Sequence, residues 1–93
     1  MYNTGVIACD GEVPAQLKAV LSIFFPCKFY FENTTNIEQA IKLYCEKNEF
    51  KYLEQAPFGV EFLIVFWDKK DQRCKAAINQ AYKNGTPTFI YYL

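Results

Sequence analysis

The sequence contains no histidine, and its 93 residues include only four glycines, one methionine and one tryptophan. Without histidine, catalysis near neutral pH would depend on carboxylate, lysine, tyrosine or thiolate side chains. The scarcity of glycine matters equally, because a dinucleotide-binding loop needs several glycines to bring its backbone against a pyrophosphate. No such cluster occurs, and neither does the GxxxxGK[ST] sequence of a P-loop. The common phosphate-binding motifs are therefore excluded.

The chain also lacks an excess of either charge and a long apolar run. Ten Lys and Arg residues balance ten Asp and Glu residues, so no positive field exists to neutralise a nucleic-acid backbone. The longest apolar run, residues 62–67, is far shorter than the roughly 20 residues that span a bilayer. The first residues do not have the basic and apolar segments of a signal peptide. We expect a cytoplasmic protein that binds neither nucleic acid nor membranes.

Four cysteines are spread along the chain without any Cys-x-x-Cys pair. A zinc site would need all four thiols from four separate elements, because no histidine is present to help. Buried, reduced thiols are the simpler interpretation of Cys9, Cys27 and Cys45. Cys74 lies beside Arg73 at the start of a predicted helix, where a thiolate would be favoured, but its helical phase points inward. We predict no metal ion, no cofactor and no catalytic residue.

The length and composition predict one globular domain spanning residues 1–93. Hydrophobic residues make up 52% of the chain, and nine Phe and seven Tyr residues give more aromatic surface than so small a core easily hides. Part of that surface is expected at a ligand pocket or at a subunit contact, both of which favour aromatic side chains.

Strand-like and helix-like patterns alternate along the sequence. Runs of β-branched and aromatic residues predict strands at residues 4–9, 27–31, 60–67 and 88–92. Apolar residues at helical spacing predict the three helices between them: residues 13–24, residues 36–47 behind a capping box of Thr35 and Glu38, and residues 72–83 behind Asp71.

The alternation predicts an α/β fold, a minimal Rossmann-like three-layer sandwich of about four parallel strands with three helices. The preferred strand order is 2-1-3-4, with residues 60–67 as the central strand. Residues 48–57 are predicted to be a helix tail and loop, or at most an irregular edge strand. A five-residue parallel strand there would require a return path of roughly 17 Å, for which the connection to the next strand is too short.

The candidate site lies beyond the carboxyl ends of the predicted first and third strands, where the strand order reverses. The loops that meet there each open a helix, so free amides and the positive ends of helix dipoles would suit an anion. Asp10 and Asp68 would hold a ribose or act as an acid and base, or they would only cap helices. Trp67 would stack on a nucleobase or only fill the end of the sheet. The lysines and the arginine would bind phosphate or remain solvated. The predicted ligand-binding residues are Asp10, Gly11, Glu12, Asn33, Thr34, Thr35, Trp67, Asp68, Lys69, Lys70 and Arg73.

Residues 60–70 (VEFLIVFWDKK) and 76–87 (AAINQAYKNGTP) resemble the C-terminal half of small SLOG-superfamily proteins, in the branch related to YspA and YpsA. In that branch a strand ends in Phe-Trp-Asp-Gly and a Ser-Arg-Gly-Thr loop follows. Here Lys69 and Lys70 follow the Trp-Asp pair, and residues 71–74 (DQRC) replace that loop. The resemblance implies a Rossmann-like domain of nucleotide-binding ancestry with rewritten ligand loops, similar to accessory proteins of phages and mobile elements.

Three functions remain open on this sequence. The first is a non-catalytic module that binds a nucleotide or a nucleotide-derived small ligand at the carboxyl edge of the sheet. The second is a protein-interaction or homodimeric accessory protein with an inactive ligand site, in which exposed aromatic residues such as Tyr91 and Tyr92 make the contact. The third, a nucleotide-processing hydrolase, is least favoured because histidine, metal-site spacing and the family's glycines are missing.

Overall fold

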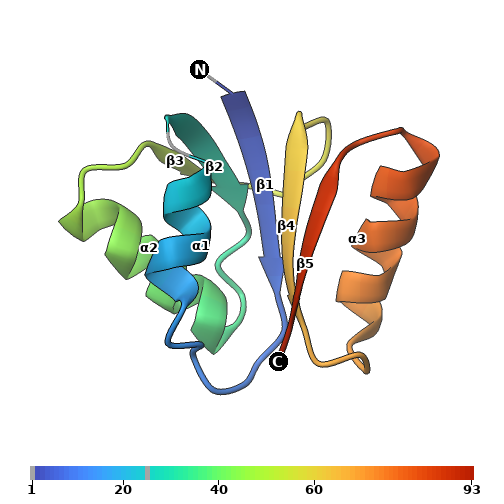
Figure 1. Cartoon of the computed structure of the whole chain (residues 1–93), viewed down its shortest axis with the longest axis horizontal. Coiled ribbons are helices and arrows are strands. Elements are labelled where there is room, and N and C mark those ends of the chain that lie inside the picture. The colour runs from blue at the N-terminus through green and yellow to red at the C-terminus, as the bar shows by residue number, and fades with distance from the viewer. Residues whose placement is uncertain (1, 25) are drawn as a thin grey trace.

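The computed structural model describes residues 2–24 and 26–93 as a five-stranded sheet with helices on both faces (Figure 1). All the strands are parallel, and α1 and α2 cover one face while α3 covers the other. The predicted α/β class and three-layer arrangement are therefore confirmed. In chain order the elements are β1 (Tyr2–Ala8), α1 (Leu17–Ile23), β2 (Cys27–Phe31), α2 (Asn36–Lys47), β3 (Tyr52–Glu54), β4 (Phe62–Trp67), α3 (Gln72–Lys83) and β5 (Thr88–Tyr92).

The sheet order is β3-β2-β1-β4-β5, which keeps the predicted 2-1-3-4 order and adds one strand at its edge. The predicted count of about four strands is corrected by β3, which the sequence suggested only as an irregular possibility. The connection would be too short for a parallel strand of five residues, but β3 has only three. Tyr52, Phe29, Thr4 and Phe62 lie in one row across the sheet. Between the end of β3 and the start of β4, the chain therefore has to travel back along the strand direction by only two residues, about 7 Å. Residues 55–61 are long enough for this connection.

Residues 55–61 cross β1 at a glycine instead of forming a helix between β3 and β4. A Cβ atom at Gly5 would lie 2.8 Å from Pro57 Cβ and 3.0 Å from Val60 Cγ2. The backbone of Glu61 also donates a hydrogen bond to the Asn3 carbonyl, at 2.8 Å. Gly5 is therefore required because the connection lies directly on β1.

The hydrophobic core has two parts of different character, one on each face of the sheet. The cluster under α1 and α2 includes large side chains such as Phe29, Phe31 and Phe66. The cluster under α3 contains the small residues Cys74, Ala77 and Ala81, together with side chains of β1 and β4. These small residues let α3 lie close against the sheet.

Three predicted elements have wrong boundaries. The first strand runs from Tyr2 to Ala8 and not over residues 4–9. The first helix begins at Leu17 and not near Val13, since the Leu17 amide closes a turn on the Pro14 carbonyl and Gln16 provides no side-chain cap. Residues 60–67 were predicted as the central strand, but β4 begins at Phe62 and the added edge strand leaves β1 in the middle of the sheet. The predicted caps Thr35 and Asp71 are confirmed, because each side chain accepts a hydrogen bond from an amide of its helix.

Candidate functional site

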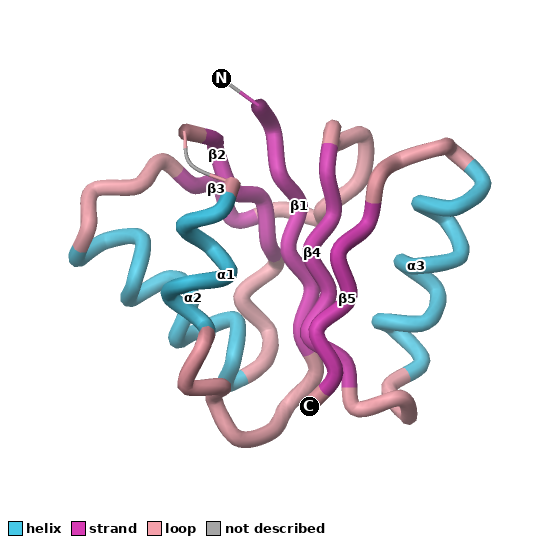
Figure 2. The backbone as a smooth tube through the Cα atoms, in the orientation of Figure 1, coloured by secondary structure: helices cyan, strands magenta, loops and turns pink. Residues whose placement is uncertain are grey.

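The loops after β1 and β4 and the C-terminus lie at the same end of the sheet (Figure 2). They enclose a hollow of about 460 Å³, named here the carboxyl-edge pocket. Of the predicted site residues, Asp10, Gly11, Glu12 and Asp68 line it. Six residues that were not predicted for the site complete the wall: Val13, Pro14, Ala15, Tyr91, Tyr92 and Leu93.

The carboxyl-edge pocket combines three carboxylates with two phenol rings. Tyr91 packs against Phe66 with ring centroids 5.7 Å apart, and its hydroxyl donates a hydrogen bond to Gln16 Oε1 at 2.7 Å. Tyr92 is 53% exposed, and the ammonium nitrogen of Lys69 lies 4.9 Å from the centre of its ring. The lining thus offers hydrogen-bond acceptors and an aromatic surface, and the Lys69 ammonium lies over one of its two rings.

Asp10 and Asp68 hold the loops in place through backbone amides. Asp10 Oδ1 accepts from the Asn36 amide at 2.9 Å. Asp68 Oδ1 accepts from the amides of Lys70 and Asp71, at 2.8 and 2.9 Å. These amide hydrogen bonds lower the pKa of Asp68, so its carboxylate is charged at neutral pH. Amides at these helix starts, where the sequence predicted an anion site, are therefore already bound by carboxylates of the chain itself.

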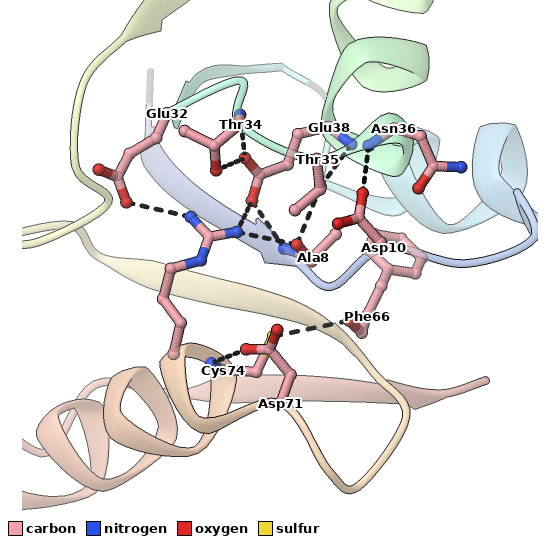
Figure 3. A network of polar contacts seen from close by, with 11 residues as sticks. Ala8, Asp10, Glu32, Thr34, Thr35, Asn36, Glu38, Phe66, Asp71 and Cys74 are labelled. Carbon is pink, nitrogen blue, oxygen red and sulfur yellow. Dashed lines mark hydrogen bonds and ion pairs between the residues drawn. The ribbon is translucent and has the colours of Figure 1, made fainter.

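Glu38 is the residue whose role the sequence did not reveal. It is 0% exposed, and both of its oxygens accept hydrogen bonds (Figure 3). Oε2 accepts from the Ala8 amide at 3.0 Å and from Arg73 Nη2 at 2.6 Å. Oε1 accepts from the amide and the hydroxyl of Thr34, at 2.8 and 3.2 Å. The Glu38 carboxylate thus joins the ends of β1 and β2 to the start of α3.

The predicted capping box is only half formed for this reason. Thr35 Oγ1 accepts from the Glu38 amide at 3.2 Å, as expected. The Glu38 carboxylate does not return to the amide of the cap residue but turns toward β1 and Arg73. No spacing rule identifies a partner 35 residues away, so the sequence indicated only the local half of this arrangement.

Arg73 lies in the same internal network and not in the carboxyl-edge pocket. Its Nη2 also donates to the Ala8 carbonyl at 2.9 Å, and its Nη1 donates to Glu32 Oε1 at 3.1 Å. Burial alone would lower the pKa of Arg73, but the hydrogen bond and charge of Glu38 raise it. The guanidinium is therefore a fixed cation that holds the loops together.

The remaining predicted residues divide between this network and the loop after β4. Asn33 has a positive φ of 61°, and Thr35 Oγ1 donates to the Ala8 carbonyl at 2.9 Å. Trp67 is half-buried, and its indole donates to the Asp71 carbonyl at 3.0 Å, so it anchors that loop. Lys70 is exposed. The predicted set thus forms two neighbouring groups, of which only the one around Asp10 and Asp68 borders the pocket.

The thiols provide no nucleophile. All four cysteines are buried and unpaired, which confirms the structural role predicted for Cys9, Cys27 and Cys45 and the inward direction of Cys74. Burial raises the pKa of Cys74 to about 12, against which the nearby Arg73 has only a small effect. A thiol with this pKa stays protonated at physiological pH.

Among residues 2–24 and 26–93, no three or more Asp, Glu or Cys side chains are grouped so that they could hold a metal ion. Within the same part of the chain, every helix is too short or too polar to cross a membrane. No protein-family model, no curated protein and no solved structure matches the chain. The resemblance to SLOG-superfamily proteins stays a prediction.

Proposed function

We propose that the domain is a non-catalytic binding module for a nucleotide-derived small molecule, which it holds by the nucleoside part in the carboxyl-edge pocket. The observation that carries this proposal is the pairing of acidic and aromatic groups in one pocket at the point where the strand order reverses. Its ancestry in the nucleotide-binding SLOG superfamily is part of the proposal.

The chemistry of the lining favours a nucleoside over a bare phosphate. Carboxylates of Asp10, Glu12 and Asp68 accept hydrogen bonds from ribose hydroxyls or base amino groups, whereas they repel an anion. The exposed ring of Tyr92 offers a face on which a base can stack, an interaction typically worth about 1–3 kcal/mol. A phosphate on the same ligand would lie toward Lys69, whose ammonium lies over the Tyr92 ring.

The same groups are poorly suited to acid and base catalysis. A general base works best with a pKa near the operating pH, and the amide hydrogen bonds of Asp68 move its pKa in the opposite direction. Cys9, which directly precedes Asp10, and Cys74 are both buried, and burial raises the pKa of each thiol. A binding role therefore fits the pocket better than hydrolysis. Four reduced thiols also fit the cytoplasmic location that we propose.

Thermal unfolding in the presence of ligands tests the proposal. Nucleosides and nucleoside monophosphates should stabilise the protein, and at 100 times the dissociation constant the gain is about 2.7 kcal/mol. For a domain of this size that corresponds to a rise in Tm of about 10–20 °C. Inorganic phosphate and ribose-free phosphates should give no rise.

Variants of the lining separate binding from folding. Glu12→Gln removes a pocket charge that has no hydrogen-bond or ion-pair partner among the described residues, and Tyr92→Leu removes the stacking surface. Both should keep the Tm of the free protein within a few degrees and abolish most of the ligand-induced rise. The matched control Glu46→Gln, on the exposed side of α2, should keep that rise. An equal rise in the wild type and both pocket variants would place the ligand elsewhere.

A second candidate function, a protein-interaction module, is supported by a separate feature. Tyr2, Phe24, Phe62 and Phe89 form a chain of ring contacts at the amino ends of the strands, with centroid distances of 5.2–6.2 Å. Tyr2 is 55% exposed within this cluster. Exposed aromatic clusters are typical of protein contacts, and this one lies beside the edge strand β5.

A further inference from the structure

The two edges of the sheet differ in how they are protected. The β3 edge is three residues long, and Glu54 on it forms an ion pair with Lys42 at 2.7 Å. Tyr52 on the same strand donates to Glu46 Oε2 at 3.1 Å. Short length and charged side chains are the devices by which proteins keep an edge from pairing with other strands. β5 has neither, since its five residues are Thr, Phe, Ile, Tyr and Tyr.

The hydrogen-bonding groups of β5 that face outward can be identified from the ladder to β4. The Pro87 carbonyl accepts from the Leu63 amide, and the Leu93 amide donates to the Trp67 carbonyl. The backbone amide and carbonyl of one residue point to the same side of a strand, and this side alternates from residue to residue. The backbone groups of the odd-numbered residues of β5 therefore point toward β4. The amides and carbonyls of Thr88, Ile90 and Tyr92 therefore point away from the sheet.

We propose that a second copy of this chain pairs with that edge, antiparallel to β5, and joins the two sheets across a two-fold axis at Ile90. In this register Ile90 lies opposite Ile90, and Thr88 lies opposite Tyr92 of the second copy. Each of these pairs exchanges both of its outward hydrogen bonds, so all the outward groups of β5 are used. A two-fold axis requires such a self-complementary surface.

The side chains beside the edge favour a second copy as the occupant. With no charge on β5, two copies meet there without like-charge repulsion between the strands. Phe89 of one copy lies opposite Tyr91 of the other, in the close, non-hydrogen-bonded pairing that suits aromatic residues. On the α3 face, Ile78 packs in the same cluster as Ile90, and Tyr82 follows it on the same side of the helix with 86% of its surface exposed.

Sedimentation and light scattering on the full chain, from about 5 to 500 μM, test whether the mass reaches twice the 10.8 kDa of the monomer. Phe89→Lys places a charge on each copy at the joined edge and should raise the dissociation constant by about tenfold or more. Leu53→Lys is the matched control, because Leu53 is 43% exposed on the β3 edge and Phe89 is 39% exposed on the β5 edge. It should leave the dimer intact.

Hydrogen exchange on the wild-type chain provides a readout that does not depend on any variant. The amides of Thr88, Ile90 and Tyr92 should become protected as the protein concentration rises, and Ile90→Pro, which removes an outward amide, should prevent the dimer. A monomer throughout this range, or a dimer in which these three amides exchange freely, would overturn the proposal. Edge amides that become protected only when a different polypeptide is added would assign the edge to a foreign strand and would also overturn it.

Discussion

Replacing Glu38 by Gln tests whether the buried carboxylate joins the loops at the carboxyl edge. The carboxylate accepts four hydrogen bonds, two at each oxygen. An amide has only one oxygen, so in either orientation its NH₂ group faces donors: the Ala8 amide with Arg73 on one side, or Thr34 on the other. Leaving one buried donor unsatisfied costs about 1–3 kcal/mol. The half-buried guanidinium of Arg73 also loses its shortest ion pair.

Together these effects predict a loss of about 2–4 kcal/mol in the free energy of unfolding, against a total of about 5–14 kcal/mol for a chain of this length. Urea unfolding followed by circular dichroism measures the loss directly, and Tm should fall by about 10–25 °C. Glu46→Gln, an exposed substitution on the same helix, should change the free energy by no more than about 0.5 kcal/mol. A Glu38→Gln variant as stable as that control would refute the role given to the carboxylate.

Three further predictions concern residues 55–61, which cross β1, and the thiols. Gly5→Ala should cost about 1–3 kcal/mol in the free energy of unfolding, because the new Cβ would overlap Pro57; unchanged urea unfolding would mean that residues 55–61 do not lie on β1. A thiol reagent at pH 8 should label none of the four cysteines in the folded protein and all four in urea, and labelling of folded Cys74 would contradict its burial. The pKa of an unfolded cysteine is about 8.5, whereas burial raises the pKa of Cys45 and Cys74 to about 12 in the folded protein. The free energy of unfolding should therefore fall as the pH rises from about 9 toward 12. Replacing both cysteines by Ala should weaken this dependence, as urea unfolding at pH 8 and pH 10 would show.

Local patterns in the sequence predict most of the helices and strands. Thr35 and Asp71 mark the starts of α2 and α3 because a capping side chain is read within three residues of the amide that it binds. The last strand was predicted at its observed bounds, Thr88–Tyr92. The strand β3 was not predicted because its three residues are too few to show alternating apolar and polar side chains. The path of residues 55–61 across β1 also depends on a contact between Gly5 and Pro57, which are far apart in sequence.

The candidate site depended on contacts of longer range and was predicted less completely. Asp10 and Asp68 were found because the carboxyl ends of neighbouring parallel strands meet at one edge. Tyr91 and Tyr92 were expected to be exposed, but Tyr91 is half-buried, and the place of both in the pocket wall follows from the position of β5 beside β4. Glu38 and Arg73 come from helices on opposite faces of the sheet and meet in a direct ion pair beyond the end of β1, where both also bond the Ala8 backbone, so neither residue indicates the other in the sequence.

The most direct test of the proposed function is a titration of the ¹⁵N-labelled protein with adenosine and the other nucleosides, followed by amide chemical shifts. The pocket predicts saturable shifts at Gly11, Glu12, Asp68 and Tyr92, and no shift at Leu53 on the opposite edge of the sheet. Inorganic phosphate alone should leave these amides unchanged. Absence of shifts with every nucleoside at millimolar concentration, or shifts confined to residues outside the carboxyl-edge pocket, would contradict the proposed function.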